Sequence, residues 1–195
     1  MIETRTLESS KRIGQHTQFA DLQRLPHGNR EHGAFPVVIR EASKADVGLL
    51  TEILRRSFRD VAERFGLTLE NCPKHLAFCT HERIRADYAR GMQYYILEDD
   101  GAACGCVALE RPGPEFCYLG RLAVLPACRG RGFGKALAIR AFYEAWELGV
   151  HRVEIGMIAR DVRLAEWYGR LGFVRNGTKQ LDGFSFEVGF MVKRV

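Results

Sequence analysis

Residues Leu122 to Leu137 read LAVLPACRGRGFGKAL, and this stretch contains the clearest structural signal of the sequence. It begins as an apolar run typical of a buried strand, passes through a turn with three glycines at alternate positions, and continues in a helical pattern. Glycine lets the backbone approach a bulky anion, and the N–H groups in the first turn of a helix have no partner within the helix. The stretch therefore predicts a phosphate-binding turn at a helix N-terminus.

Basic residues surround this turn. Arg129, Arg131 and Lys135 stand beside the glycines and are predicted to strengthen the binding of a pyrophosphate. The net charge of the whole chain is only +5 and is otherwise spread along the sequence. This distribution favours a local anionic ligand over a nucleic-acid surface, so no nucleic-acid partner is expected.

Two well-known phosphate loops do not fit the spacing. A P-loop would need glycine at position 129 and Ser or Thr at position 136, where this chain has Arg129 and Ala136. A dinucleotide-binding fingerprint that starts at Gly130 would need glycine or alanine at position 135, where Lys135 stands. The turn must therefore belong to another class of phosphate-binding site.

The rest of the chain predicts one mixed α/β domain from 35 to 195, preceded by a polar extension from 1 to 34. A capping box at Ser43–Asp46 opens the first helix, Gly66 is placed to end it, and Asp99-Asp100-Gly101 predicts a hairpin. The predicted strands are Phe35 to Ile39, Met92 to Glu98, Ala102 to Arg111, Glu115 to Val124, Val153 to Met157 and Phe184 to Val192, and the predicted helices are Val47 to Phe65, Thr80 to Gly91, Gly132 to Gly149 and Val162 to Leu171. A meander followed by strand-helix-strand-helix-strand predicts a mixed, mostly antiparallel sheet with helices on both faces.

Two motifs together resemble a known family. Residues 129 to 134 match the pattern (Arg/Gln)-x-x-Gly-x-(Gly/Ala) at every fixed position, and residues 165 to 173 read AEWYGRLGF. In both motifs the chain resembles the GCN5-related N-acetyltransferase (GNAT) family, over roughly residues 37 to 194. The resemblance implies a sheet with a splayed strand pair, acetyl-CoA as donor and a primary amine as acceptor.

The resemblance also implies a binding mode for the donor. Leu122, Ala123 and Val124 would bind the pantetheine arm through the main chain, with the N–H of Val124 facing the thioester oxygen. The pyrophosphate would lie on the turn, which comprises Arg129, Gly130, Arg131, Gly132, Phe133, Gly134 and Lys135.

Chemistry would then proceed by direct attack of the amine on the thioester in a ternary complex. By resemblance Tyr168 is the candidate acid for the departing thiolate, although a core aromatic at this helix position would show the same spacing. Glu110 is the first candidate base and Glu115 the second, with a water chain as the alternative. Asp161 stands where many members of the family have asparagine, and we interpret it first as a helix cap.

The cysteines and histidines predict no metal site. Cys72, His75, Cys79 and His81 lie close together, but their spacing matches no common structural zinc site. Cys104 and Cys106 lie two apart on a predicted strand and are expected to pack as small apolar residues on one face. The six cysteines are expected to be reduced thiols in a cytoplasmic protein, with no membrane span and no secretory leader.

Other functions remain open at this point. One alternative is a non-catalytic module that binds acyl-CoA for sensing, and another is an acetyltransferase for protein N-termini or lysines instead of small amines. The residues identify neither the acceptor nor the acyl chain length, and a homodimer is expected from the family alone.

Overall fold

The computed structural model describes residues 37–195, so the predicted extension at 1–34 and the start of the first predicted strand lie outside the described residues. Within that range the strands form one seven-stranded sheet in the order β1-β2-β3-β4-β5-β7-β6. The strands are β1 (Val38–Glu41), β2 (Gln93–Asp99), β3 (Ala102–Glu110), β4 (Cys117–Val124), β5 (Arg152–Ile158), β6 (Val174–Gln180) and β7 (Glu187–Arg194). The helices are η1 (Lys44–Asp46), α2 (Val47–Phe65), η2 (Leu76–Phe78), α3 (His81–Ala89), η3 (Pro126–Cys128), α4 (Phe133–Glu147) and α5 (Val162–Arg170).

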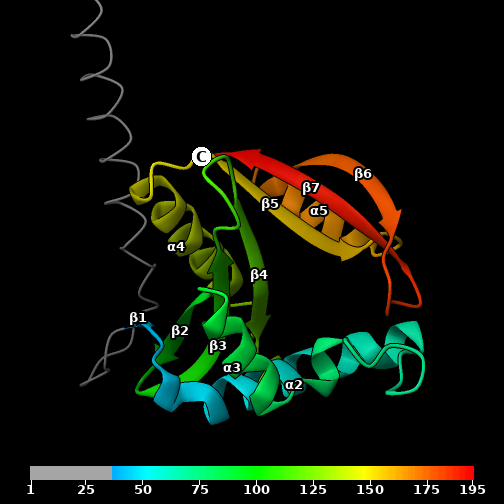
Figure 1. Cartoon of the computed structure of the whole chain (residues 1–195). Helices are drawn as coiled ribbons and strands as arrows, with labels where there is room; N and C mark the ends of the chain where they lie inside the picture. The colour runs from blue at the N-terminus through cyan, green and yellow to red at the C-terminus, as the bar shows by residue number, and fades with distance from the viewer. Residues whose placement is uncertain (1–36) are drawn as a thin grey trace, which may run out of the picture.

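The sheet is antiparallel except between β4 and β5, and this one parallel contact is short. Only Cys117 and Tyr118 of β4 pair with β5, opposite Val153 and Glu154. Beyond these pairs the two strands diverge, as Figure 1 shows, and they open toward α2. The predicted splayed strand pair is therefore present in the structure.

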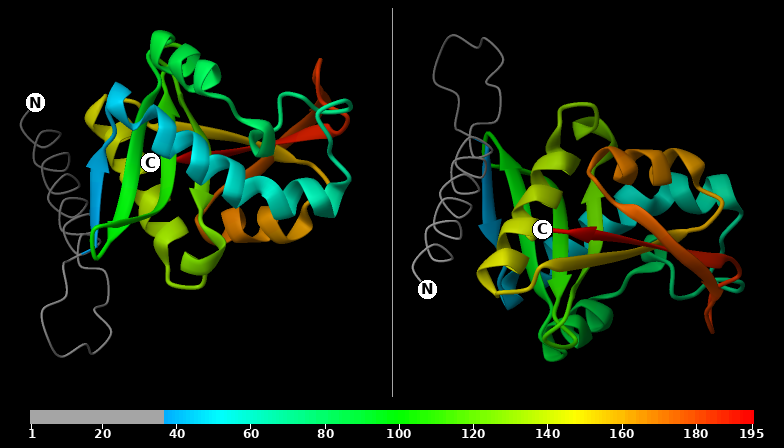
Figure 2. Two further views of the ribbon diagram at one scale, coloured as in Figure 1. Left: turned by 90° about the horizontal axis from the view of Figure 1, so that it is seen from below. Right: turned by 90° about the horizontal axis from the view of Figure 1, so that it is seen from above.

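Helices cover both faces of the sheet (Figure 2). On one face α2 and α3 pack on β2, β3 and β4, with Leu50, Leu54 and Ile84 fully buried against Tyr94 and Ile96. On the other face α4 and α5 form a second core, which comprises Leu137, Ala141, Ala165, Tyr168 and their strand neighbours Val107, Leu109 and Ile155. The glycine-rich turn leads from β4 into α4 and so lies beside the opening between β4 and β5.

Local signals in the sequence are confirmed where they predict helix ends and turns. Ser43 and Asp46 form the capping box before α2, and Gly66 ends that helix in the left-handed conformation at φ 64°. Asp100 and Gly101 both have positive φ, as a two-residue hairpin turn of type I′ requires. These features depend on neighbours within a few residues, so the sequence contains the information needed to predict them.

Strand β6 was not expected. Every residue from Val174 to Gln180 is exposed, so the strand lacks the alternation of apolar and polar residues that identifies a half-buried strand. Its backbone pairs with β7 at the edge of the sheet. The strand is therefore specified by pairing with β7 and not by an apolar face of its own.

Two β-bulges interrupt the central strands. In β4 the residues Arg121 and Leu122 together face Val107, and Arg121 adopts φ 56°. In β3 Cys104 is the extra residue, because Leu97 pairs with Gly105 whereas Glu98 pairs with Ala103. The second bulge overturns one expectation: Cys104 belongs to the core under α4 and Cys106 to the core under α2, so the two thiols lie on opposite faces.

Candidate active site

The N-terminus of α4 has no side-chain cap. Gly132 occupies the cap position at φ 81°, a left-handed conformation that favours glycine, and no side chain accepts from the first turn. The N–H groups of Phe133, Gly134 and Lys135 therefore have no intrahelical acceptor. Together with the positive end of the helix dipole they can bind an anion, which is what the sequence predicts for this turn.

The end of β4 presents free backbone on its open side. Leu125 N donates to Cys104 O on the β3 side at 2.8 Å, and backbone direction alternates along a strand. Ala123 therefore directs its backbone groups toward β3, whereas Val124 directs its own into the opening. Of the two residues, only Val124 can offer its main chain to a ligand between β4 and β5, and Leu122 lies within the bulge.

The Arg129 side chain does not point at the anion site. Its guanidinium binds the Asp60 carboxylate and donates to Ser57 O of α2 at 2.7 Å, and its Nε donates to Val124 O at 3.2 Å. The hydrogen bond from Arg129, and then its charge, lower the pKa of Asp60 against the effect of burial. The Arg129 side chain thus ties the turn to α2 and β4 in the structure, and its contact with phosphate stays a prediction.

The other two basic residues of the turn differ from each other. Arg131 forms an ion pair with Asp99 at 2.6 Å and stacks over the Phe133 ring, with its guanidinium carbon 4.5 Å from the ring centre. Lys135 is exposed and has no carboxylate partner among residues 37–195. Lys135 is therefore the basic side chain of the turn that is free to approach a phosphate.

Tyr168 lies in α5, on the α4 side of the sheet. It is 7% exposed and makes edge contacts with Trp167 and Phe173 at 4.9 and 5.3 Å between ring centres. A side chain at Gly134 would meet Trp167 at 3.4 Å, so α5 sits directly against the first turn of α4. Burial, followed by the influence of Tyr118, raises the pKa of the Tyr168 phenol, which therefore keeps its proton at neutral pH.

Tyr118 is a residue that sequence reasoning missed. It lies on β4 at the point where β4 and β5 part, and its hydroxyl occupies the space above Gly156 of β5. Burial, followed by the charge of Glu154, raises its pKa to about 12. Tyr118 also contributes to the raised pKa of Tyr168, and only the tertiary structure reveals this link between two residues that are far apart in the sequence.

Glu110 lies away from the end of β4. It pairs with Tyr118 across β3 and β4, whereas Val124 pairs with Gly105. Five residues along β3 separate Glu110 from Gly105, which corresponds to about 17 Å. The Glu110 carboxylate also accepts from Arg90 Nε at 3.3 Å, so it is engaged with a cation.

A buried carboxylate fixes the bulge of β4. Asp87 is 1% exposed and accepts two hydrogen bonds from the Arg121 guanidinium, at 3.0 and 3.1 Å. It also accepts from Tyr94 Oη and from Arg90 Nη2 at 2.5 and 2.7 Å. Burial alone would raise the pKa of Asp87, but the Arg121 charge and these hydrogen bonds lower it, so the carboxylate stays ionised and holds Arg121 in its left-handed conformation.

Asp161 caps α5, as the sequence predicts. Its Oδ1 accepts from Leu164 N at 3.2 Å, and its other oxygen pairs with Arg64 of α2 at 2.5 Å. The N-terminus of α5 is therefore occupied by a carboxylate from the chain itself and offers no anion site.

The cysteine and histidine group before α3 has ordinary structural contacts. His75 Nδ1 accepts from Ala77 N at 3.3 Å and caps η2, while its ring packs on Phe58 and Phe78. Cys72 Sγ and Cys79 Sγ each lie near a backbone carbonyl oxygen. Within residues 37–195 no group of three or more His, Cys, Asp or Glu side chains is arranged to hold a metal ion.

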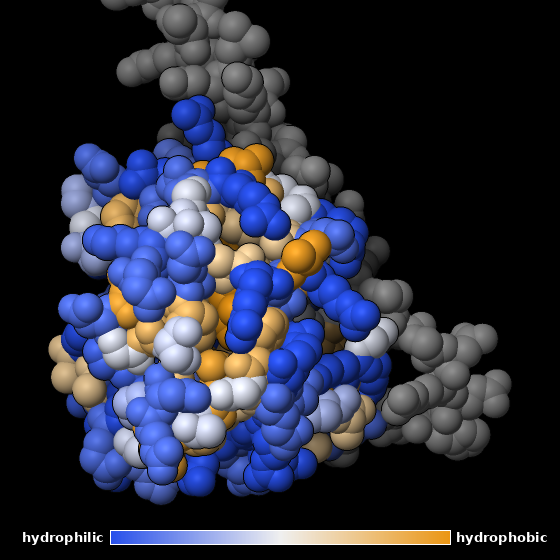
Figure 3. Space-filling view, turned by 90° about the vertical axis from the view of Figure 1, so that its right-hand side faces the viewer, coloured by the Kyte–Doolittle hydropathy of each residue, from blue (hydrophilic) through white to orange (hydrophobic). Residues whose placement is uncertain are grey.

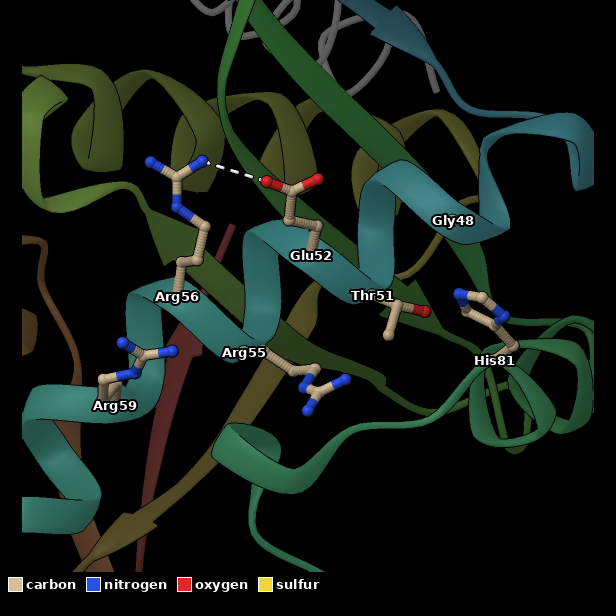
Figure 4. A pocket seen from close by; sticks show the side chains of 7 residues that line it. All are labelled: Gly48, Thr51, Glu52, Arg55, Arg56, Arg59 and His81. Atoms are coloured by element: carbon tan, nitrogen blue, oxygen red, sulfur yellow. Dashed lines mark hydrogen bonds and ion pairs between the residues drawn. The ribbon is translucent and has the colours of Figure 1, made fainter.

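A separate pocket of about 350 Å³ opens on the outer side of α2 (Figure 4). It is lined by Gly48, Thr51, Glu52, Arg55, Arg56, Arg59 and His81. Arg56 pairs with Glu52 at 3.0 Å, whereas Arg55 and Arg59 have no carboxylate partner in the described part of the chain. None of the residues predicted for donor binding lines this basic pocket.

The face beside the opening of the sheet is mixed in character. Figure 3 shows hydrophobic residues gathered near the centre of the right-hand side of Figure 1, with hydrophilic residues around them. A small apolar area with a polar rim is typical of a ligand entrance. Among the described helices none is long and apolar enough to cross a membrane.

Comparison with known proteins identifies the family. Residues 50–173, more than half of the chain, match the model of the acetyltransferase (GNAT) family. The chain is 28% identical over 124 residues to the uncharacterised N-acetyltransferase YjgM of Escherichia coli, covering 62% of this chain and 74% of the relative. An uncharacterised N-acetyltransferase of Mycobacterium tuberculosis is 28% identical over 113 residues, covering 55% of this chain and 72% of the relative.

Solved structures have the same fold. The paiA N-acetyltransferase of Thermoplasma acidophilum, in complex with coenzyme A, aligns with a TM-score of 0.65 at 17% identity over 83% of this chain and all of its own. A yncA acetyltransferase of Salmonella typhimurium with acetyl-CoA aligns with a TM-score of 0.63 at 20% identity, covering 82% and 94% of the two chains. The family match and the uncapped glycine turn after a splayed strand agree: the chain belongs to the GNAT acetyltransferase family.

Proposed function

We propose that the protein transfers an acetyl group from acetyl-CoA to a primary amine by direct attack within a ternary complex. The observation that carries the proposal is the open N-terminus of α4 directly after a strand whose last residue directs free backbone into the opening of the sheet. A long ligand with an anionic middle and an amide-rich arm fits this combination. Similar folds hold coenzyme A or acetyl-CoA, which supports the same donor here.

In this proposal the donor is held mainly by backbone groups. The pyrophosphate accepts from the N–H groups of residues 133–135 and pairs with Lys135, while Gly130 and Gly132 keep the cradle open. Val124 offers its N–H to the thioester oxygen, while its carbonyl oxygen accepts from Arg129 Nε. That N–H stabilises the oxyanion of the tetrahedral intermediate.

Proton transfer to the leaving thiolate is assigned to Tyr168. The phenol carries a proton at neutral pH, and this proton is the one that it would give to the developing thiolate. Tyr118 stands at the point where β4 and β5 part and helps to exclude water from the sulfur.

We assign deprotonation of the amine to a water chain. Glu110 was the first candidate base, but its contact with Arg90 and its distance from Val124 do not support direct proton transfer. Water in the opening between β4 and β5 can carry the proton to bulk solvent. The acceptor, whether a small amine or a protein amine, is not identified by these residues.

The cysteines and the edge of the sheet bear on where the protein works and how it assembles. All six cysteines are free thiols in the structure, which supports a reducing compartment such as the cytoplasm. A homodimer is proposed from the family resemblance, with the exposed edge strand β6 as one surface open to a second copy. Light scattering on the purified protein would measure the assembly directly.

The donor is tested by thermal unfolding with acetyl-CoA, CoA, ATP and NAD, because a ligand that binds the folded state raises the midpoint. A shift with acetyl-CoA and CoA alone supports the donor assignment, and no shift near a millimolar contradicts it. Thiol release in a screen of small amines and peptides then separates an enzyme from a module that only binds acyl-CoA. Binding without release on any acceptor would favour the sensing module.

A further inference from the structure

Two thiols meet beneath the phosphate turn. Cys128 ends η3, one residue before Arg129, and Cys104 lies on the neighbouring strand β3. Their sulfurs are 2.8 Å apart, less than 1 Å longer than the roughly 2.05 Å of a disulfide bond.

The backbone holds this pair in place. Leu125 N donates to Cys104 O at 2.8 Å, and Cys128 N donates to Leu125 O at 2.8 Å. The bulge at Cys104 turns its side chain to the α4 face, where Cys128 packs, while Cys106 faces α2. Bond formation would therefore need the sulfurs to approach by less than 1 Å.

Exposure differs between the two thiols. Cys104 is 4% exposed, and burial, followed by its hydrogen bond with Cys128, raises the pKa of its thiol to about 12. Cys128 is half-buried and is the more accessible of the six cysteines. The other four thiols are 0 to 1% exposed, so an oxidant in solution reaches Cys128 first.

We propose that Cys104 and Cys128 form a reversible disulfide when the protein meets a two-electron oxidant such as hydrogen peroxide. The Cys128 thiolate attacks one peroxide oxygen, the O–O bond breaks, and the second oxygen leaves as water after taking a proton. Cys104 sulfur then attacks the resulting sulfenic acid, the S–O bond breaks, and the hydroxyl leaves as water with the Cys104 proton. In sum, two thiols and one peroxide give one disulfide and two waters, and an excess of dithiol reverses the reaction.

The link would lock the phosphate turn to the sheet. It closes a loop from Cys104 to Cys128 that contains all of β4, so it constrains the unfolded chain. Because native geometry is almost unchanged, the oxidised protein is expected to melt several degrees higher than the reduced protein.

The test uses the reduced full-length chain, treated with hydrogen peroxide, alkylated and digested with trypsin without reduction. The peptide Leu122–Arg129 contains Cys128 as its one cysteine, and we expect it to be joined to the peptide Gly91–Arg121, which contains Cys104. Cys104→Ser must abolish the link and the rise in melting temperature. Cys106→Ser, which changes a thiol of the same strand on the opposite face, must leave both in place.

Two results would overturn the proposal. One is the absence of any peptide joined to Leu122–Arg129 after peroxide has consumed the Cys128 thiol. The other is an equal yield of that joined peptide from the Cys104→Ser variant, which would show that Cys106 or Cys117 is the partner. Recovery of both thiols with dithiothreitol is the expected sign that the bond is reversible.

Discussion

The helices α4 and α5 pack on the same face of the sheet, but their N-termini are built in opposite ways. Helix α5 begins after Asp161, whose carboxylate accepts from Leu164 N. Helix α4 begins after Gly132, which has no side chain, and its first turn is left open. A helix N-terminus can bind an anion only where no side chain of the protein caps it. The first-turn N–H groups of α4 have no such cap, whereas Asp161 accepts from the first turn of α5.

The charged side chains at the two helix N-termini also differ. The Asp161 carboxylate is balanced by Arg64 of α2, so the start of α5 is neutralised within the fold. At the start of α4, Asp60 and Asp99 engage Arg129 and Arg131, and Lys135 is left for a ligand. The proposed anion site would therefore rely on backbone dipoles and one lysine more than on the cluster of three basic residues.

The largest expected effect comes from giving α4 the cap that α5 has. Gly132→Asp places a carboxylate in the phosphate cradle, in a left-handed conformation that aspartate tolerates. Two like charges about 4 Å apart cost about 4 kcal/mol near a protein surface, which predicts a loss of about 1000-fold in acetyl-CoA affinity. Titration calorimetry with acetyl-CoA measures this affinity.

Gly132→Asn is the matched control, because it has the same shape without the charge. We expect it to retain affinity within about tenfold, since only one N–H is covered. Equal losses in both variants would mean that space and not charge limits the site, and unchanged affinity in Gly132→Asp would remove the turn from the donor site.

The second prediction concerns the chemistry assigned to α5. Tyr168→Phe removes the phenol proton and keeps the ring contacts with Trp167 and Phe173. We expect kcat to fall about 100-fold, with KM for acetyl-CoA changed less than about threefold. Thiol release under saturating donor measures both. A normal kcat would leave Tyr168 with a packing role alone.

Removing the cap of α5 should affect stability and not binding. Asp161→Ala leaves Leu164 N without its acceptor and Arg64 without its ion pair. We expect unfolding free energy to fall by about 2 kcal/mol, seen in urea denaturation, with donor affinity within about threefold of wild type. Asp161→Asn keeps a side-chain oxygen that can accept from Leu164 N, so its free energy of unfolding should fall less than that of Asp161→Ala. A large loss of donor affinity in Asp161→Ala would show that the N-terminus of α5 also takes part in donor binding.

The smallest expected effect is a pH dependence of stability that comes from His75, the N-cap of η2. Burial, followed by the charge of Arg83, lowers the pKa of His75 to about 4, so the folded protein keeps a neutral imidazole to accept from Ala77 N. The unfolded chain binds this proton near pH 6.5, so stability falls as the pH drops from about 6.5 toward 4. At pH 5.5 the expected loss is about 1 kcal/mol.

Urea denaturation between pH 7 and pH 5 measures this slope. His75→Asn retains a side-chain acceptor at the cap but does not titrate, so its stability should vary less over the same range. An identical slope in both proteins would show that other groups control the acid sensitivity.

The sequence by itself determined the parts of this protein that depend on neighbours along the chain. The capping box before α2, the Asp100-Gly101 turn, the open glycine turn before α4 and the Asp161 cap all follow from residues within a few positions of one another. Backbone conformation at these points is set by local sterics and local hydrogen bonds. The family motifs consist of the same local features, which is why the sequence pointed to the acetyltransferase fold.

Only the tertiary structure decided what the side chains of the turn do. Arg129 meets Asp60, 69 residues earlier in the chain, and Cys128 meets Cys104 because a bulge turned that thiol to the other face. Strand β6 likewise forms by pairing with β7. It has no apolar face, so no alternating pattern in the sequence predicts it. A one-residue bulge reverses the side of a side chain, and an ion pair is fixed by the packing of two distant elements; neither depends on a pattern that is readable along the chain.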